Sequence, residues 1–204
     1  MSTKDCDAFL KVAHQFKLGS LETEKPHPLT VNLSQEAQTD LGKAIASLKQ
    51  VDSLAFQKMK NYLPKIAVMG KSIHESLKDG GTVYLCGCGA TGRLSISLEV
   101  FCRGGMIPAE YSEKIIGFMA GGDTALIKSI ENFEDHPEYG ARQLLELGFK
   151  DGDLLISITE GGETPFVIGA TEAAASVSKK PPWFLYCNPE AQLIEEIERS
   201  AKVI

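Results

Sequence analysis

The sequence has no segment that suits a membrane or export from the cell. No run of apolar residues approaches the ~18 to 20 needed for a membrane span. The N-terminus, Met1 to Asp5, lacks the basic and then apolar order of a signal peptide. We therefore expect a cytoplasmic protein without a membrane partner.

Cysteine is scarce, and its spacing excludes the common frameworks built from it. The five cysteines are an odd number and include no C-x-x-C pair, so they indicate neither a zinc site nor a complete disulfide set. We expect reduced packing residues, no metal and no other cofactor. The alternative is a reactive thiol at Cys88, because a helix is predicted to begin beside it and a helix N-terminus stabilises a thiolate.

Positive charge is also in short supply. The 204 residues include 21 Lys and Arg against 27 Asp and Glu, which gives a net charge of −6. An acidic protein is not drawn to nucleic acid at long range, so we expect no nucleic-acid partner. Any anionic ligand must then be held by local geometry.

Apolar runs separated by helical periods fill the second part of the chain. Strand-like runs occupy residues 82–86, 115–119, 154–158 and 183–187. Nearly continuous apolar strands with helices between them favour parallel pairing and crossover helices on both faces of the sheet. The sequence therefore predicts a doubly wound α/β/α sandwich with a central parallel sheet. We divide the chain into an N-terminal arm and helix, residues 1–52, and this α/β domain, residues 53–204.

Helical periods also precede the first strand. A short helix around residues 9–16 is followed by an extended arm and by an amphipathic helix from Ser34 to Val51. A second helix is predicted from Asp52 to Lys78, and Pro64 is expected to break or restart it. The helix from Ser34 to Val51 is also a candidate packing element of a homodimer.

The run from Val83 to Ser95 joins a buried strand to a helix through a glycine turn. Such a turn points backbone N–H groups and the positive end of the helix at one place, where an anion is expected. Gly87 and Gly89 permit positive φ angles and close approach of a ligand, whereas Gly92 lets the helix lie near the strand. The Thr91 hydroxyl can donate to a phosphate oxygen.

Other interpretations of this turn stay open. The glycines match the dinucleotide pattern G-x-G-x-x-G, but the acidic residue that should end the next strand is missing. No Gly-Lys-Ser/Thr follows, as a Walker loop would require. A further interpretation is a strand-to-helix turn that binds no ligand.

Polar clusters follow each predicted strand, and parallel strands end at one rim of the sheet. After the third strand, Thr159 and Thr164 offer hydroxyls, and Thr164 is placed to cap the next helix. Gly161 and Gly162 between them offer bare backbone. This predicts a second anion site facing the first, although Glu163 would repel a phosphate unless it turned away. Plain turn chemistry is the alternative.

Two acidic residues follow the second strand. A helix is predicted after Gly122, and Glu131 and Glu134 would share one face near its C-terminal end. A carboxylate that reaches the rim can bond a sugar hydroxyl or move a proton. A solvated acidic face is the alternative.

Six segments match, in order and spacing, the motifs of one known family. They are His27 to Thr30, Gly89 to Leu94, Ala120 to Asp123, Glu131 to Asp135, Thr164 to Val167, and Asn188 with Pro189. On these residues the chain resembles the sugar isomerase (SIS) domain family, in the branch that holds N-acetylmuramic acid 6-phosphate etherases and glucokinase regulatory proteins. The resemblance runs from about Glu22 to the end of the chain and implies a phosphosugar ligand near the boundary between two SIS domains.

The resemblance also implies roles for single residues. Thr91 falls on the serine that grips phosphate, and Glu134 falls on the glutamate that is assigned as the base next to the sugar carbonyl. The acid of the etherases becomes Phe101, which cannot transfer a proton, and this loss favours the regulatory branch. Glu99 and Glu163 are the candidate substitutes for that acid.

Our leading interpretation is a phosphosugar-binding SIS domain over residues 53–204 that acts as a sensor or regulator of the glucokinase regulatory type, with a sugar kinase as a candidate partner. The rival interpretation is an enzyme, either an N-acetylmuramic acid 6-phosphate etherase or an aldose-ketose isomerase, with Glu134 as the base. The expected ligand contacts are Gly87, Gly89, Ala90, Thr91, Gly92, Arg93, Glu131, Glu134, Thr159, Gly161, Gly162, Glu163 and Thr164.

The resemblance bears on assembly as well. Relatives continue past the position of Ile204 into a further strand and helix that complete the site. We therefore expect either a fragment of a longer protein or a shortened product whose pocket needs another chain. In both cases we expect a homodimer.

Overall fold

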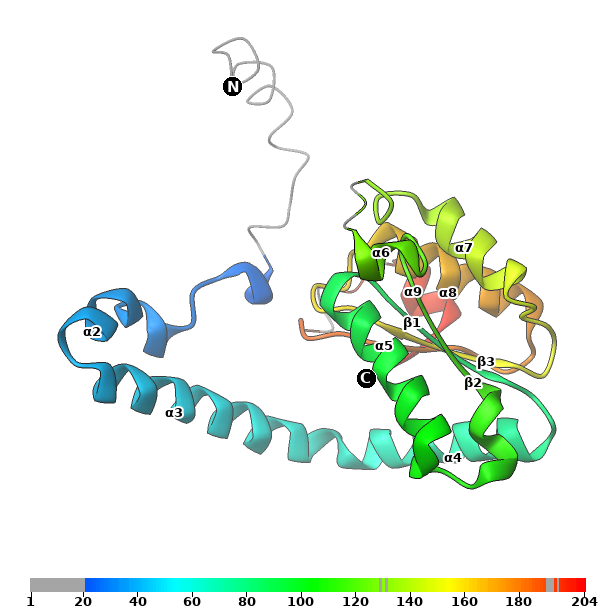
Figure 1. Ribbon diagram of the computed structural model, residues 1–204, viewed down its shortest axis with the longest axis horizontal. Coiled ribbons are helices and arrows are strands. Elements are labelled where there is room, and N and C mark those ends of the chain that lie inside the picture. Colours follow the sequence, from blue (N-terminus) through cyan, green and yellow to red (C-terminus); the bar gives the residue numbers. More distant parts are fainter. Residues whose placement is uncertain (1–20, 129, 131, 190–192, 194) are drawn as a thin grey trace, which may run out of the picture. The chain divides into compact units, whose positions relative to one another are not determined.

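The computed structural model describes residues 21–128, 130, 132–189, 193 and 195–204. The short helix expected around residues 9–16 and the candidate ligand contact Glu131 lie outside the described residues. The chain forms two compact units, one ending at Asn61 and the other running from Tyr62 to Ile204 (Figure 1).

The first unit consists of short turns and two helices. The turns are η3 (Glu22–Glu24) and η4 (Pro28–Thr30), and the helices are α2 (Leu33–Thr39) and α3 (Leu41–Met59). The single helix predicted from Ser34 to Val51 is wrong, because it is interrupted at Asp40. The Asp40 carboxylate accepts a hydrogen bond from the Lys43 N–H at 3.0 Å and so caps the start of α3. The predicted boundary after residue 52 falls inside α3.

The second unit begins with a helix that restarts at a proline. A single 3-10 turn, η5 (Lys60–Tyr62), separates α3 from α4 (Leu63–Lys78), and Pro64 occupies the first turn of α4. Proline is favoured there because its missing N–H would have no helical partner anyway. The restart predicted at Pro64 is confirmed.

A five-stranded, wholly parallel sheet forms the centre of the second unit, as predicted. Its strands are β1 (Val83–Gly87), β2 (Ile115–Met119), β3 (Leu154–Ile158), β4 (Trp183–Leu185) and β5 (Lys202–Val203). The order across the sheet is β2-β1-β3-β4-β5. In register, Val83 lies opposite Ile115 on one side and Leu154 on the other. The sequence reasoning missed β5, which has only two residues, one of them a lysine.

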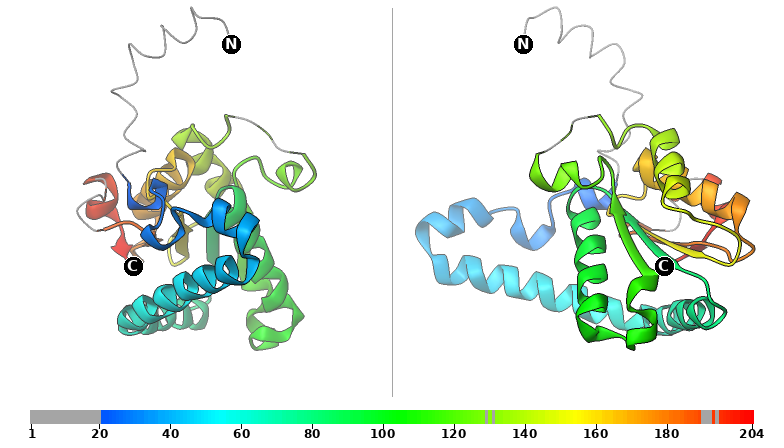
Figure 2. Two further views of the ribbon diagram at one scale, coloured as in Figure 1. Left: turned by 90° about the vertical axis from the view of Figure 1, so that its left-hand side faces the viewer. Right: turned by 45° about the vertical axis from the view of Figure 1, so that its right-hand side comes forward.

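Helices cover both faces of this sheet and separate two apolar cores. Along β1, Val83 and Leu85 pack with Leu77 of α4, whereas Tyr84 and Cys86 pack with α8 and its neighbours on the other face. The first face carries α4 and α5 (Gly89–Phe101), and the second carries α7 (Pro137–Glu146), α8 (Pro165–Val177) and α9 (Glu195–Ser200). Figures 1 and 2 show these helix layers around the strands.

The strand order reverses at β1, so the connections that leave β1 and β3 diverge at the carboxyl ends of these strands. The chain leaves β1 for α5 on one face and leaves β3 for α8 on the other. Ligands of doubly wound folds bind where two such connections diverge. The glycine turn after β1 and the Thr159 loop after β3 both lie at this rim.

The segment after β2 differs from the prediction of a helix that carries Glu134. Among the described residues of this segment only α6 (Thr124–Ile127) is helical, and at Lys128 the backbone becomes extended with φ −141°. Asn132 then turns the chain with φ +64°, and α7 starts at Pro137. Glu134 therefore belongs to a turn and not to a helix face. None of the described helices has the length and hydrophobicity of a membrane span.

Candidate functional site

Glycines shape the turn between β1 and α5. Gly89 has φ +50°, as predicted, but Gly87 has no positive φ and the expectation for it was wrong. Gly87 is needed for space, because a Cβ there would lie 2.6 Å from the Thr91 carbonyl carbon. At Gly92 a Cβ would lie 2.5 Å from the Met119 Cβ, which confirms that this glycine lets the helix approach the sheet.

The Thr91 side chain is bonded inside this turn. Its hydroxyl donates to the Cys88 carbonyl at 2.8 Å and accepts from the Cys88 N–H at 3.2 Å. The Thr91 N–H in turn donates to the Cys88 sulfur, which completes a capping box. Because a hydroxyl has a single proton, Thr91 would have to give up one of these bonds to donate to a phosphate.

The remaining donors at the start of α5 are backbone groups. Among the described residues, none accepts a hydrogen bond from the N–H of Gly89 or of Ala90. Both residues are exposed. Free N–H groups at a helix N-terminus, together with the helix dipole, form an anion site.

A cavity of about 160 Å³ opens beside these amides. It brings together three of the predicted contacts, Gly89, Arg93 and Glu134, from two sequence motifs. The sequence reasoning missed the other residues that line it, which are Met119, Ala120, Ala125, Ile130, Asn132 and Phe133. These six come from the end of β2, from α6 and from the irregular segment after α6, where a continuous helix was predicted.

Two charged side chains of opposite sign line this cavity. The Arg93 guanidinium donates from Nη2 to the Ala125 carbonyl at 3.5 Å, and no carboxylate among the described residues pairs with it. The Glu134 carbonyl accepts from the Phe166 N–H at 2.9 Å, which fixes the turn against the start of α8. The cavity thus offers the Arg93 cation and the Gly89 amide for an anion, with one carboxylate on its wall.

The loop after β3 is bonded internally and does not line the cavity. Thr159 and Thr164 share a hydroxyl hydrogen bond of 3.0 Å, and the Gly162 N–H donates to Thr159 Oγ1 at 3.4 Å. The Gly161 carbonyl accepts from Asn188 Nδ2 at 2.8 Å. Thr164 does occupy the N-cap position of α8, as predicted, but its side chain makes no capping bond.

In the second anion site predicted at the start of α8, one backbone amide is already hydrogen bonded within the protein. The Phe166 N–H is bonded to Glu134, and the residue before it is Pro165, which has no N–H. Glu163 is half-buried and does not line the cavity. The contacts predicted at Thr159, Gly161, Gly162, Glu163 and Thr164 therefore support the rim without facing the cavity.

Glu99, a candidate substitute acid, is engaged elsewhere. Its Oε2 accepts from the Gly117 N–H at 2.6 Å, and its Oε1 pairs with Arg103 at 3.0 Å. Gly117 lies in β2, the edge strand of the sheet, so this carboxylate covers an edge amide that would otherwise be open to pairing. Phe101 stands at the end of α5 and is 53% exposed.

The Cys88 thiol is held neutral. Burial, and after it the nearby Glu134 carboxylate, raise its pKa to about 12. The reactive thiolate considered from the sequence is therefore wrong, because desolvation outweighs the pull of the helix N-terminus.

The raised pKa of the Cys88 thiol can be tested by measuring how the free energy of unfolding changes at high pH. The folded-state pKa near 12 exceeds the value of 9.0 for an unperturbed cysteine thiol, so between pH 9 and 12 the unfolded chain releases a proton that the folded chain keeps. Unfolding free energy should fall with rising pH by up to about 1.4 kcal/mol per pH unit from this one group. We expect urea unfolding of Cys88→Ser to show a shallower decline over that range. Equal slopes in both proteins would contradict the buried thiol.

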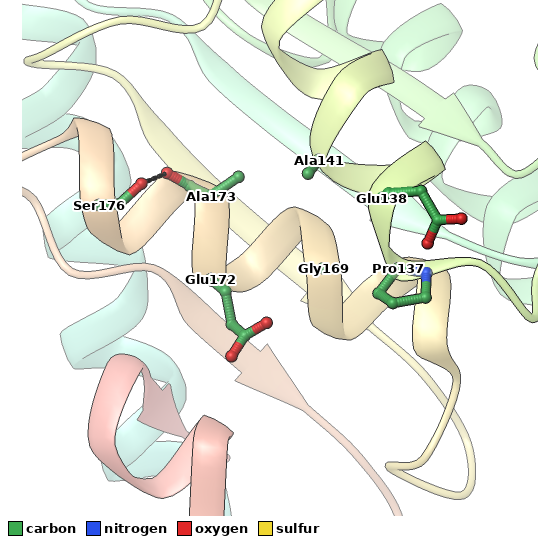
Figure 3. Close-up of a pocket in the computed structure, with 7 residues that line it drawn as sticks. All are labelled: Pro137, Glu138, Ala141, Gly169, Glu172, Ala173 and Ser176. Carbon is green, nitrogen blue, oxygen red and sulfur yellow. Dashed lines mark hydrogen bonds between the residues drawn. The ribbon is translucent and has the colours of Figure 1, made fainter.

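A larger groove of about 350 Å³ lies between α7 and α8 (Figure 3). Small residues form much of its surface, and Glu138 and Glu172 bring two carboxylates to it. It lies away from the strand ends and would repel a phosphate. Among the described residues there is also no cluster of three or more His, Cys, Asp or Glu that suits a metal ion. The smaller cavity at the rim is therefore the candidate site.

Comparisons with known proteins place the chain among proteins of one family. Residues 65–175 match the family described as glucokinase regulatory protein N-terminal SIS domain. An N-acetylmuramic acid 6-phosphate etherase of Photorhabdus laumondii is 32% identical over 89% of this chain and 58% of its own length. The etherase of Aliivibrio fischeri strain MJ11 is 33% identical over 87% of this chain and 57% of its own length. The chain thus spans about three fifths of these curated relatives.

A solved structure supports the fold. Phosphoheptose isomerase from Neisseria gonorrhoeae superimposes with a TM-score of 0.56 at 18% identity and covers 80% of this chain and 84% of its own. At this identity the likeness concerns the arrangement of helices and strands alone. The matched family range, residues 65–175, contains every residue that lines the rim cavity.

Proposed function

Because this chain belongs to the family of glucokinase regulatory protein N-terminal SIS domains, we propose that its rim cavity binds a phosphorylated sugar and that Glu134 removes the proton next to the sugar carbonyl. The curated relatives named N-acetylmuramic acid 6-phosphate etherases support a substrate of the amino-sugar 6-phosphate class. Proton removal from such a sugar is the step that an etherase and an aldose-ketose isomerase would share.

One observation carries the proposal, which is the separation of charge within the cavity. The free amides of Gly89 and Ala90 lie at the start of α5, and Arg93 follows on the same helix. Glu134 comes from the segment after β2. A phosphate dianion is attracted to the amides and the guanidinium and repelled by the carboxylate. A phosphosugar is therefore oriented with its ring toward Glu134.

The described residues supply a base but no evident acid. Glu134 is the only carboxylate among the described residues that line the cavity. Glu99 is bonded to the β2 edge, and Phe101 cannot transfer a proton. Exchange of the sugar proton needs only a base, whereas cleavage of the lactyl ether also needs a proton for the leaving group. Proton exchange is accordingly the activity expected of this chain alone, and release of D-lactate would indicate an acid from another segment or chain.

A second candidate is a sensor that binds the phosphosugar without turnover. Phe101 in place of the etherase acid favours it, as does the family to which residues 65–175 belong. In that role the protein would act in the cytoplasm as a homodimer and would regulate a sugar kinase. Exchange of the C2 proton of N-acetylglucosamine 6-phosphate in deuterated water separates the two candidates, because a sensor would leave that proton in place.

Binding can be tested before any turnover. In calorimetry we expect heat with N-acetylmuramic acid 6-phosphate or another hexose phosphate and none with unphosphorylated N-acetylglucosamine. Arg93→Gln should weaken phosphosugar binding by about 10- to 100-fold, the range for a hydrogen bond to a charged group. Arg142→Gln is the matched control, since Arg142 pairs only with Glu146 on the exposed side of α7. No heat with any phosphorylated sugar would contradict the proposal.

A further inference from the structure

Asn132 has an unusual backbone for a residue with a side chain. Among the described residues it is the only one other than glycine with a positive φ, at +64°. Asparagine tolerates this left-handed region better than most residues do. At Asn132 a left-handed turn therefore carries a side chain.

This side chain lies on the wall of the rim cavity. Asn132 lines the cavity together with Phe133 and Glu134. Two contacts, one through Phe133 and one through Glu134, fix this turn to the neighbouring helices. The Phe133 ring packs against Tyr139 with a centroid distance of 4.9 Å, and the Glu134 carbonyl bonds to the Phe166 N–H. Asn132 and Glu134 therefore line the same cavity from one anchored turn.

The carboxamide adds a kind of chemistry that the cavity otherwise lacks. It has one acceptor oxygen and two N–H donors, and no described residue forms a hydrogen bond with it. The charged groups of the wall, Arg93 and Glu134, have roles toward the phosphate and the reacting carbon. A neutral amide is suited to a neutral polar group on the sugar.

We propose that Asn132 determines which sugar is bound, by hydrogen bonding of its carboxamide to a neutral ring substituent, a hydroxyl or an acetamido group. This inference rests on the proposed phosphosugar site and adds a specificity contact to it. The phosphate itself is held by other residues, so the contribution of Asn132 is confined to the ring. A change at this position should alter discrimination between ligands and leave the affinity for inorganic phosphate as it is.

Asn132→Gly tests the carboxamide while keeping the backbone, because glycine adopts positive φ freely. Calorimetry of the full chain would use N-acetylglucosamine 6-phosphate, glucose 6-phosphate and inorganic phosphate. We expect affinity for the sugar phosphate to fall by about 3- to 10-fold, the range for one neutral hydrogen bond, with inorganic phosphate unchanged. A fall only for the N-acetylated sugar assigns the acetamido group, and an equal fall for both sugars assigns a shared hydroxyl.

Asn32→Gly is the matched control, because Asn32 precedes α2 in the first unit and makes no capping bond with its side chain. Sugar phosphates that bind to Asn132→Gly as tightly as to the unchanged protein would overturn this inference and leave the proposed function intact. An equal loss for inorganic phosphate would also overturn it, since that would show a change in cavity shape. If the unchanged protein binds no phosphorylated sugar, the proposed function fails and this inference fails with it.

Discussion

Replacing Gly169 by alanine is expected to destabilise the protein by about 3 kcal/mol, the upper part of the range for overpacking. Gly169 lies in α8 where that helix crosses α7, and a Cβ there would lie 1.9 Å from the Pro137 carbonyl oxygen. Gly140 in α7 faces α8 in the same way, with its added Cβ 1.8 Å from the Phe166 carbonyl oxygen. Because both obstacles are backbone atoms, no change of rotamer relieves the clash and the helices must move apart.

Gly70 offers the matched control for this substitution. It lies in the middle of α4, is exposed, and a Cβ there would meet nothing within 4 Å. Alanine is favoured over glycine in a helix interior by about 1 kcal/mol, so Gly70→Ala should stabilise the protein slightly. Urea unfolding followed by circular dichroism would compare the two variants. If Gly169→Ala proved as stable as Gly70→Ala, α7 and α8 would not pack as closely as described.

The helix crossing also bears on the candidate site. Gly140 contacts the carbonyl of Phe166, and the N–H of Phe166 bonds to the carbonyl of Glu134. Separation of α7 from α8 would therefore shift the turn that carries Glu134. We expect Gly140→Ala, where it still folds, to impair the site as well as the stability, whereas Gly70→Ala should leave phosphosugar binding unchanged.

The central strands could be predicted from the sequence because their burial is nearly complete. Leu154 to Ile158 and Ile115 to Met119 are observed with the bounds predicted for them. Strands covered on both faces appear as continuous apolar runs between turn residues. The short β5 lacks such a run, and its pairing with β4 depends on long-range packing that a local pattern does not record.

The segment after β2 was predicted wrongly because its apolar spacing imitates a helix. Ile127, Ile130 and Phe133 recur at every third position, yet Ile127 is 92% exposed and α6 ends there. Asn132 adopts positive φ and Pro137 starts a new helix, so the backbone between them has to turn. Side-chain directions in this segment, and hence most of the cavity wall, could not be deduced from helical periodicity.

The partners of Thr91 and Cys88 at the β1–α5 turn could not be predicted, for one reason. The sequence showed a hydroxyl at Thr91 and a thiol at Cys88 next to a helix start, but not how they are partnered or buried. Thr91 and Cys88 bond to each other, so the hydroxyl serves the turn. Burial raises the thiol pKa, whereas a helix dipole is worth only about 1 kcal/mol at most sites. Desolvation depends on tertiary packing and therefore has no local signal in the sequence.

Glu134→Gln is expected to slow exchange of the sugar C2 proton by about 10²- to 10⁴-fold, the usual contribution of a general base. The amide has nearly the same shape as the carboxylate but cannot accept the proton. The bond from the Phe166 N–H to the carbonyl of residue 134 involves the backbone alone, so the turn should keep its structure. Affinity for the phosphosugar should change by only a few-fold, because the amides of α5 and Arg93 are unaltered. Exchange is followed by proton NMR of N-acetylglucosamine 6-phosphate in deuterated water.

Glu163→Gln is the matched control for this substitution, since Glu163 is at the same rim but does not line the cavity. It should leave the exchange rate unchanged, and loss of exchange in this variant alone would transfer the role of base to Glu163. A second readout is independent of turnover. The negative charge of Glu134 helps to raise the Cys88 pKa, so the glutamine variant should lower that pKa and alkylation of Cys88 at pH 10 to 11 should become faster. Unchanged alkylation together with unchanged exchange would show that the carboxylate lies away from both the thiol and the sugar.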